Sequence, residues 1–282
     1  MKQILVPTDF STCANNALNF AIQSAKLLPV EVTLLHSFEI KGSSYTDYMG
    51  LTQEFRQYML DEIETKLKDI KESIEETEGI TVKTIISKKS LKDSILDVAE
   101  DKFFDLIVMG TLGASGIKEK LWGSNTAKII GSSNVPVLAI PYKYEWIKPK
   151  KISIATNHFE EDPEILDLLF EMADLYMAQV HAVVFDYEKY DDEDPTMQFA
   201  EKIPKYEMLL KEKYNEESLT VSQITGTDFE KSLQEYIAIN EVDMLAMISY
   251  QRSFWNRIFD PSMTRRMAYH TKIPLLVISS KK

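Results

Sequence analysis

The stretch Gly110-Thr-Leu-Gly113-Ala-Ser-Gly116-Ile-Lys-Glu-Lys-Leu-Trp-Gly123-Ser124-Asn125 links a strand to a helix. The apolar run 106–109 before it is typical of a buried parallel strand, and residues 126–130 after it predict a short helix that ends at Gly131. Glycines let backbone N–H groups approach a phosphate, and a helix N-terminus adds partial positive charge. This order predicts an anion site, with Ser124 expected as the helix N-cap.

The spacing of the glycines excludes two well-known types of phosphate-binding loop. No Gly-Lys-Ser/Thr ending follows, so the loop is not of the Walker A type, and it also lacks the tight GxGxxG turn of dinucleotide folds. It has two residues between Gly110 and Gly113, nine between Gly113 and Gly123, and then Ser124. Spaced glycines also occur in plain connectors. The strand-to-helix setting favours a phosphate-binding loop.

Composition restricts the class of protein. A chain of 282 residues with 44% hydrophobic and 27% charged residues predicts a globular protein of about two domains. The net charge of −12 argues against a general nucleic-acid surface. The single cysteine, Cys13, fits a reducing cytoplasm. We expect no signal peptide, because a strand begins within three residues of Met1, and no membrane span.

The chain contains a diverged duplication. Residues 2–8 align with 150–156, an offset of 156 − 8 = 148, and residues 31–35 align with 179–183 at the same offset. Residues 105–109 align with 243–247, an offset of 243 − 105 = 138. A repeat of this length predicts two similar domains, at residues 1–143 and 150–282, joined by a linker at Lys148-Pro149-Lys150.

Within each copy, strand and helix patterns alternate. The first copy predicts strands at 3–7, 30–38, 80–86, 106–109 and 135–140, with helices at 11–27, 46–76 and 91–102 and a short helix after the loop. The second copy predicts strands at 152–156, 180–186, 219–225, 244–249 and 275–279, with helices at 163–177, 197–214 and 229–240. Alternation of this kind indicates an α/β fold, a parallel sheet with helices on both faces. Thr8, Asp9 and Gly110 would then lie at one edge, where the carboxyl ends of strands bind ligands.

The complete glycine pattern resembles the ATP-binding branch of the universal stress protein family. Residues 4–11, Ile-Leu-Val-Pro-Thr-Asp-Phe-Ser, look like that family's first strand and adenine-side turn, and residues 134–140 look like its last strand. The resemblance is specific over residues 1–143 and fainter beyond. It implies two tandem Rossmann-like domains of the adenine nucleotide alpha hydrolase type, each with a five-stranded parallel sheet, in a cytoplasmic stress-response protein.

The resemblance also implies roles for individual residues. Pro7, Thr8 and Asp9 would form the adenosine side, with Ser37 near the adenine, and Met109 and Gly110 would border the ribose and phosphates. Gly113, Gly123, Ser124 and Asn125 would hold the phosphates of ATP. Asp9 is a candidate ligand for an accompanying Mg²⁺ ion, but one carboxylate does not decide whether metal binds.

The second copy lacks this loop. At the offset of 138, Gly110 becomes Ile248, Gly113 becomes Gln251 and Gly123 becomes Pro261, while Ser124 is matched by Ser262. Proline has no N–H for a phosphate, and the other two positions carry side chains. The sequence therefore predicts one ATP per chain, with a second domain that keeps the fold and loses this site.

Three functions compete at this point. The first is a regulatory protein in which bound ATP changes the surface offered to partners, and the second is a slow ATP hydrolase on the same scaffold. The third is an interaction scaffold without ligand. Four scattered histidines and Cys13 suggest no catalytic set, and no water-positioning group is evident beside the loop. We expect a binding protein rather than an enzyme.

The last strands of the two copies predict how the copies associate. Residues 135–140 and 275–278 are apolar and lie at potential sheet edges. Pairing them would satisfy backbone groups that are otherwise open. Single-domain members of the resembled family commonly pair in this way, which implies a pseudo-dimer within the chain. A further homodimer of two chains is also expected, with an adenine nucleotide and an unnamed protein as partners.

Overall fold

The structure is a computed structural model. It describes residues 1–39, 51–101, 104–111, 124–156, 158–187, 195–214, 217–250 and 272–280. Gly113 and Gly123 lie outside these ranges, as do Gln251, Pro261 and Ser262.

The first half alternates strands and helices as predicted. Its elements are β1 (Gln3–Pro7), α1 (Thr12–Ala25), β2 (Glu31–Ser37), α3 (Leu51–Glu78), β3 (Val82–Ser87), α4 (Leu91–Asp101), β4 (Leu106–Gly110), α5 (Ser124–Ile130) and β5 (Val137–Ile140). One expectation is wrong in detail. Ser124 is itself helical in α5, so it is not the N-cap of that helix.

The second half repeats the plan. It consists of β6 (Lys151–Thr156), α6 (Pro163–Tyr176), β7 (Gln179–Tyr187), α7 (Pro195–Tyr214), β8 (Thr220–Gly226), α8 (Phe229–Ile239), β9 (Met244–Tyr250) and β10 (Leu275–Ser280). The described elements match the predicted ones to within a few residues at their ends.

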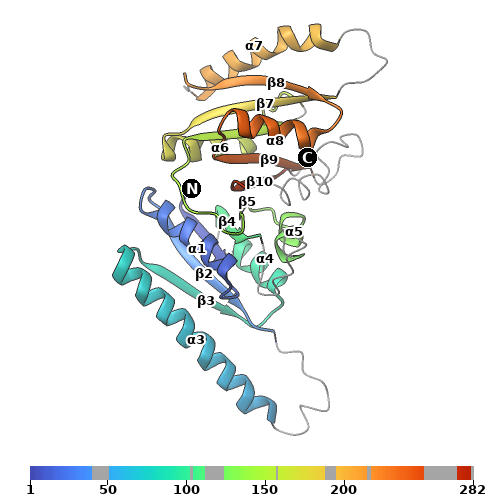
Figure 1. The fold of residues 1–282 in the computed structure, drawn as a ribbon. Coiled ribbons are helices and arrows are strands. Elements are labelled where there is room, and N and C mark those ends of the chain that lie inside the picture. Colours follow the sequence, from blue (N-terminus) through green and yellow to red (C-terminus); the bar gives the residue numbers. More distant parts are fainter. Residues whose placement is uncertain are drawn as a thin grey trace.

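All ten strands form one sheet in the order β3-β2-β1-β4-β5-β10-β9-β6-β7-β8. Neighbouring strands within each half are parallel. The halves meet through β5 and β10, which are antiparallel with Leu276 opposite Leu138. Figure 1 shows this central pair between the two sets of helices. The prediction that the last strands of the two copies pair is confirmed, and so is the α/β fold.

Each face of the sheet carries its own core. Along β1, Ile4 and Val6 belong to one core and Leu5 to the other, as alternation in a strand requires. Helices α1, α3, α6 and α7 contribute to the first core. Helices α4, α5 and α8 contribute to the second. The sheet is therefore covered on both faces in both halves.

The halves also contact through α1 and α6, on the face of the first core. The hydroxyl groups of Ser24 and Tyr176 are hydrogen-bonded at 2.6 Å, and both side chains are buried. Burial raises the pKa of Tyr176 to about 12, so its hydroxyl stays protonated. The terminal ammonium of Met1 pairs with Glu171. No helix in the described ranges is long and apolar enough to cross a bilayer.

Candidate nucleotide-binding site

The candidate site lies where β1 and β4 run side by side. These strands are parallel neighbours, with Leu5 opposite Ile107. From β1 the chain proceeds outward to β2 and β3, and then returns to β4 on the other side. This change of direction is the position at which α/β sheets bind ligands, beyond the carboxyl ends of the strands. Thr8 and Asp9 follow β1, and Gly110 ends β4, so the structure brings these predicted residues to one edge.

The turn after β1 is held by its own side chains. The hydroxyl oxygen of Thr8 accepts a hydrogen bond from the Phe10 N–H at 3.0 Å, and Oδ1 of Asp9 accepts one from the Ser11 N–H at 3.0 Å. Ser11 is the N-cap of α1, and its hydroxyl accepts from the Ala14 N–H. Thr8 is buried, whereas Asp9 is exposed at the edge. The carboxylate of Asp9 is thus fixed in place and open to solvent.

Phe10 has a left-handed backbone conformation, with φ of 62°. This conformation is unfavourable for a bulky residue, and such residues cluster at functional sites. The Phe10 ring stacks on His36 with ring centroids 4.5 Å apart, and Nζ of Lys66 lies 5.8 Å from its centroid. Sequence analysis missed Phe10, because a backbone conformation of this kind has no pattern in residue types.

His36 lies in β2 and is hydrogen-bonded to the turn after β1. Its Nδ1 lies 2.8 Å from the carbonyl oxygen of Thr8, and since a carbonyl can only accept, Nδ1 carries the proton. Burial lowers the pKa of His36, although the hydrogen bond to Thr8 and the charge of Asp9 act in the opposite direction. These contacts give His36 a structural role in holding the turn after β1.

This lowered pKa predicts a pH dependence of stability. The unfolded imidazole has a pKa of about 6.5, above the folded value, so the unfolded state binds more protons between the two. The stabilising contribution of His36 is therefore present above the unfolded pKa and is lost as the pH falls towards the folded pKa. We expect an NMR titration of the His36 ring to give a pKa below 6.5, and a His36→Gln variant to lose this part of the pH slope of unfolding. A ring that titrates above the model-peptide value would contradict the prediction.

Gly110 has a structural reason to be glycine. A Cβ at this position would lie 2.6 Å from the carbonyl carbon of Cys13 and closer still to its oxygen. The first turn of α1 thus packs directly on the backbone of Gly110. The carbonyl oxygen of Gly110 accepts a hydrogen bond from the Thr126 hydroxyl at 2.8 Å, which ties the end of β4 to α5.

The other predicted site residues have different surroundings. Pro7 and Met109 are buried, and the Met109 side chain belongs to the second core, so only its backbone faces the edge. Asn125 is exposed in the first turn of α5. The Ser37 hydroxyl donates to the carbonyl oxygen of Lys89 at 2.8 Å. This bond engages the polar group of Ser37 with the protein itself, away from a ligand.

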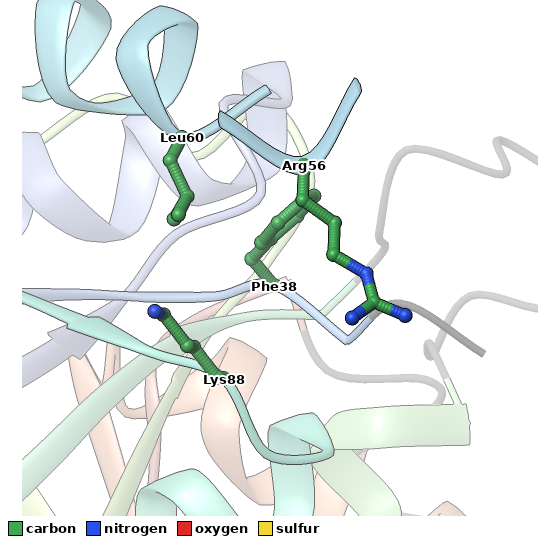
Figure 2. Close-up of a pocket in the computed structure, with 4 residues that line it drawn as sticks. All are labelled: Phe38, Arg56, Leu60 and Lys88. Carbon is green, nitrogen blue, oxygen red and sulfur yellow. The ribbon is translucent and has the colours of Figure 1, made fainter. Parts of the chain in front are cut away.

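A pocket of about 280 Å³ lies next to Ser37. Figure 2 shows its four labelled residues: Phe38 follows β2, Lys88 follows β3, and Arg56 and Leu60 come from α3. Sequence analysis did not single out these residues. Their pattern of two apolar and two basic side chains is assembled from three separate segments, so nothing in the local sequence indicates it.

The second half differs at the equivalent edge. Ile248, the counterpart of Gly110, is buried in β9. At the offset of 148, the α1 start at Thr12 corresponds to position 160, but α6 begins at Pro163. The helical turn that packs on Gly110 therefore has no equivalent beside Ile248. Because no helical turn packs against this position in the second half, a side chain can replace the glycine there.

No group of three or more histidine, cysteine or acidic side chains within the described ranges is arranged to hold a metal ion. Oxygen ligands at this edge are Asp9 and the hydroxyl and backbone groups around it. This donor set would suit Mg²⁺, an ion that keeps several of its waters and takes one or two carboxylates.

Comparisons with known proteins agree with this description. The universal stress protein family matches residues 1–141. Universal stress protein MJ0577 of Methanocaldococcus jannaschii is 33% identical over 156 residues, which cover 50% of this chain and 96% of that protein. A crystal structure of a universal stress protein from Archaeoglobus fulgidus covers 98% of both chains at 18% identity, with a TM-score of 0.76, which shows that both halves share its fold. A further universal stress protein, solved in complex with cAMP, covers 49% of this chain at 21% identity with a TM-score of 0.34. The chain belongs to the universal stress protein family.

Proposed function

We propose that the first half binds one molecule of ATP at the carboxyl edge of β1 and β4, and that the bound nucleotide acts as a regulatory switch in a cytoplasmic stress response. The observation that carries the proposal is the convergence of Thr8, Asp9 and Gly110 at the point where the strand order reverses. The glycine spacing of 110–123 supports phosphate binding there.

The proposed switch works through α3. Two side chains of this helix, Arg56 and Leu60, line the pocket beside Ser37, and a third, Lys66, lies over Phe10. A ligand that displaces or orders these groups would change the conformational population of the helix. Among the residues that the structure describes at this edge, no group is evidently placed to activate water, so we propose binding without fast hydrolysis. Association of two chains stays a prediction.

Calorimetry with ATP tests the site. We expect one ATP per chain, and about tenfold weaker binding by Asp9→Asn, because the amide keeps the turn hydrogen bond but loses the charge that strengthens a bond to the ligand. Asp228→Asn is the matched control, since Asp228 caps α8 through the same kind of bond in the other half. Two equivalent sites, or equal loss in both variants, would refute the proposal.

Hydrogen exchange with and without ATP tests the switch. We expect added protection in the loop 110–125 and in α3, together with phosphate release well below the rate of about 1 s⁻¹ at the low end of typical enzymes. If ATP left hydrogen exchange in α3 unchanged, the protein would bind ATP without the proposed switch. Turnover at or above that rate would show that the protein is an ATP hydrolase and not a binding switch.

A further inference from the structure

A groove of about 440 Å³ runs between α1 and α3. Both helices are labelled in Figure 1, with α3 at the outer end of the first half. The described residues that line the groove belong to these two helices, among them Leu18, Asn19, Ile22, Asp69, Ile70 and Ile74.

The second half fills the equivalent space with its own side chains. Ile22 corresponds to Phe170, at the offset 170 − 22 = 148 that also relates β1 to β6. In the sheet, Lys83 of β3 lies opposite Thr33, and Thr220 of β8 lies opposite His181, the counterpart of Thr33, so β3 and β8 are related by an offset of 220 − 83 = 137. At this offset Tyr214 of α7 corresponds to Thr77 of α3, which lines the groove. The rings of Phe170 and Tyr214 stack with centroids 3.8 Å apart and planes at 6°. An aromatic pair thus closes the groove in one half, and the corresponding isoleucine and threonine, Ile22 and Thr77, leave it open in the other.

Hydrogen bonding in the closed half shows what an occupant would need. The Tyr214 hydroxyl donates to Oδ1 of Asp167 at 2.7 Å. Asn19 is the counterpart of Asp167, at 167 − 19 = 148, and its side-chain amide can also accept a hydrogen bond. The groove of the first half therefore keeps an acceptor at the place where a phenol hydroxyl would arrive.

The charges of the groove favour a basic partner. Among its described lining residues are two acids, Asp69 and Glu78, and no base. Glu78 is paired with Lys26, whereas Asp69 is exposed at the rim. In the second half, Nζ of Lys213 lies 5.0 Å from the centroid of the Tyr214 ring, so a cation accompanies the ring there too. The complementary ligand is an aromatic ring with a basic group beside it.

We propose that the groove between α1 and α3 is a docking site for a partner protein, which inserts an aromatic side chain next to a lysine or arginine. Leu18, Ile22, Ile70 and Ile74 receive the ring, Asn19 accepts its hydroxyl group, and Asp69 attracts the basic residue. This site is separate from the nucleotide edge and does not depend on the proposed function.

Methyl NMR of the full chain, with the dipeptide Ac-Lys-Tyr-NH₂ as the probe, tests the proposal. We expect saturable shifts at the methyl groups of Leu18, Ile22, Ile70 and Ile74, with a dissociation constant in the millimolar range. Ac-Lys-Ala-NH₂ should give no saturable shift, because it lacks the ring. Ac-Glu-Tyr-NH₂ should bind about threefold more weakly, because an exposed charge contributes little.

Two kinds of variant complete the test. Ile22→Phe combined with Thr77→Tyr copies the closed groove and should abolish probe binding. Asp69→Lys, which leaves the helix packing intact, should weaken binding, while Glu76→Lys makes the same charge change on α3 outside the groove and should not. Equal shifts with all three dipeptides, no shift, or unchanged binding by the closed variant would overturn the proposal. So would a closed variant that converts a dimer of the chain into a monomer, since the occupant would then be a second copy.

Discussion

Replacing Gly110 with alanine is expected to lower the free energy of unfolding by about 3 kcal/mol, at the upper end of the usual cost of overpacking. The added Cβ would lie 2.6 Å from the carbonyl carbon of Cys13, a separation that real Cβ atoms essentially never show. The two atoms nearest to the added Cβ, the carbonyl oxygen and carbonyl carbon of Cys13, belong to the backbone, so they cannot move aside as a flexible side chain could. Either β4 or the first turn of α1 must shift, and Thr8, Asp9 and the end of β4 would no longer hold their relative positions. Urea denaturation measures the loss, and calorimetry should show ATP binding fall with it.

Gly131→Ala is the matched control. A Cβ there would lie 3.6 Å from the nearest atom, the carbonyl oxygen of Ala127, which is an ordinary contact. Its effect should stay within about 0.5 kcal/mol, as for most surface changes. If Gly110→Ala were as stable as this control, the close packing of α1 on β4 would not be a feature of the protein in solution.

Gly110 has two roles, of which only one could be predicted from the sequence. The spacing 110–123 identified Gly110 as a phosphate-loop residue by pattern, whereas the structure adds that the glycine makes room for α1. That second reason depends on where another helix begins. Ile248 is tolerated at the equivalent position because α6 starts later than its counterpart. Contacts between distant segments of this kind are not visible in a local pattern.

The architecture was predictable for a physical reason. Alternating strand and helix patterns fix a parallel sheet, and two offsets, 148 and 138, reveal the duplication. The apolar ends 135–140 and 275–278 predicted the β5–β10 pair, because open edges need partners. Details that depend on a single backbone angle or on side chains from several segments were not predictable. Phe10, with its positive φ, and the pocket of Phe38, Arg56, Leu60 and Lys88 are examples.

The β5–β10 pair leads to the second large effect. Residues 1–143 expressed alone are expected to form a dimer. In the full chain, β5 is paired with β4 on one side and with β10 on the other, and all four of its residues are buried. Without the second half, one row of backbone groups in β5 and the apolar side chains around it would be exposed in the middle of a core. An exposed flat strand of this kind pairs with another chain.

A second copy offers the same strand in the geometry that β10 provides. Because β10 is antiparallel to β5, a two-fold axis between two β5 strands would reproduce the pair, with Leu138 facing its own copy where Leu276 now stands. Light scattering should give twice the mass of the fragment, and circular dichroism should show that it is folded. A folded fragment that stays monomeric well above micromolar concentration would mean that the central pair contributes little to association. An unfolded fragment would mean that 1–143 is not an independent domain. The dimer, in contrast, would show that the duplication joined two partners that already matched.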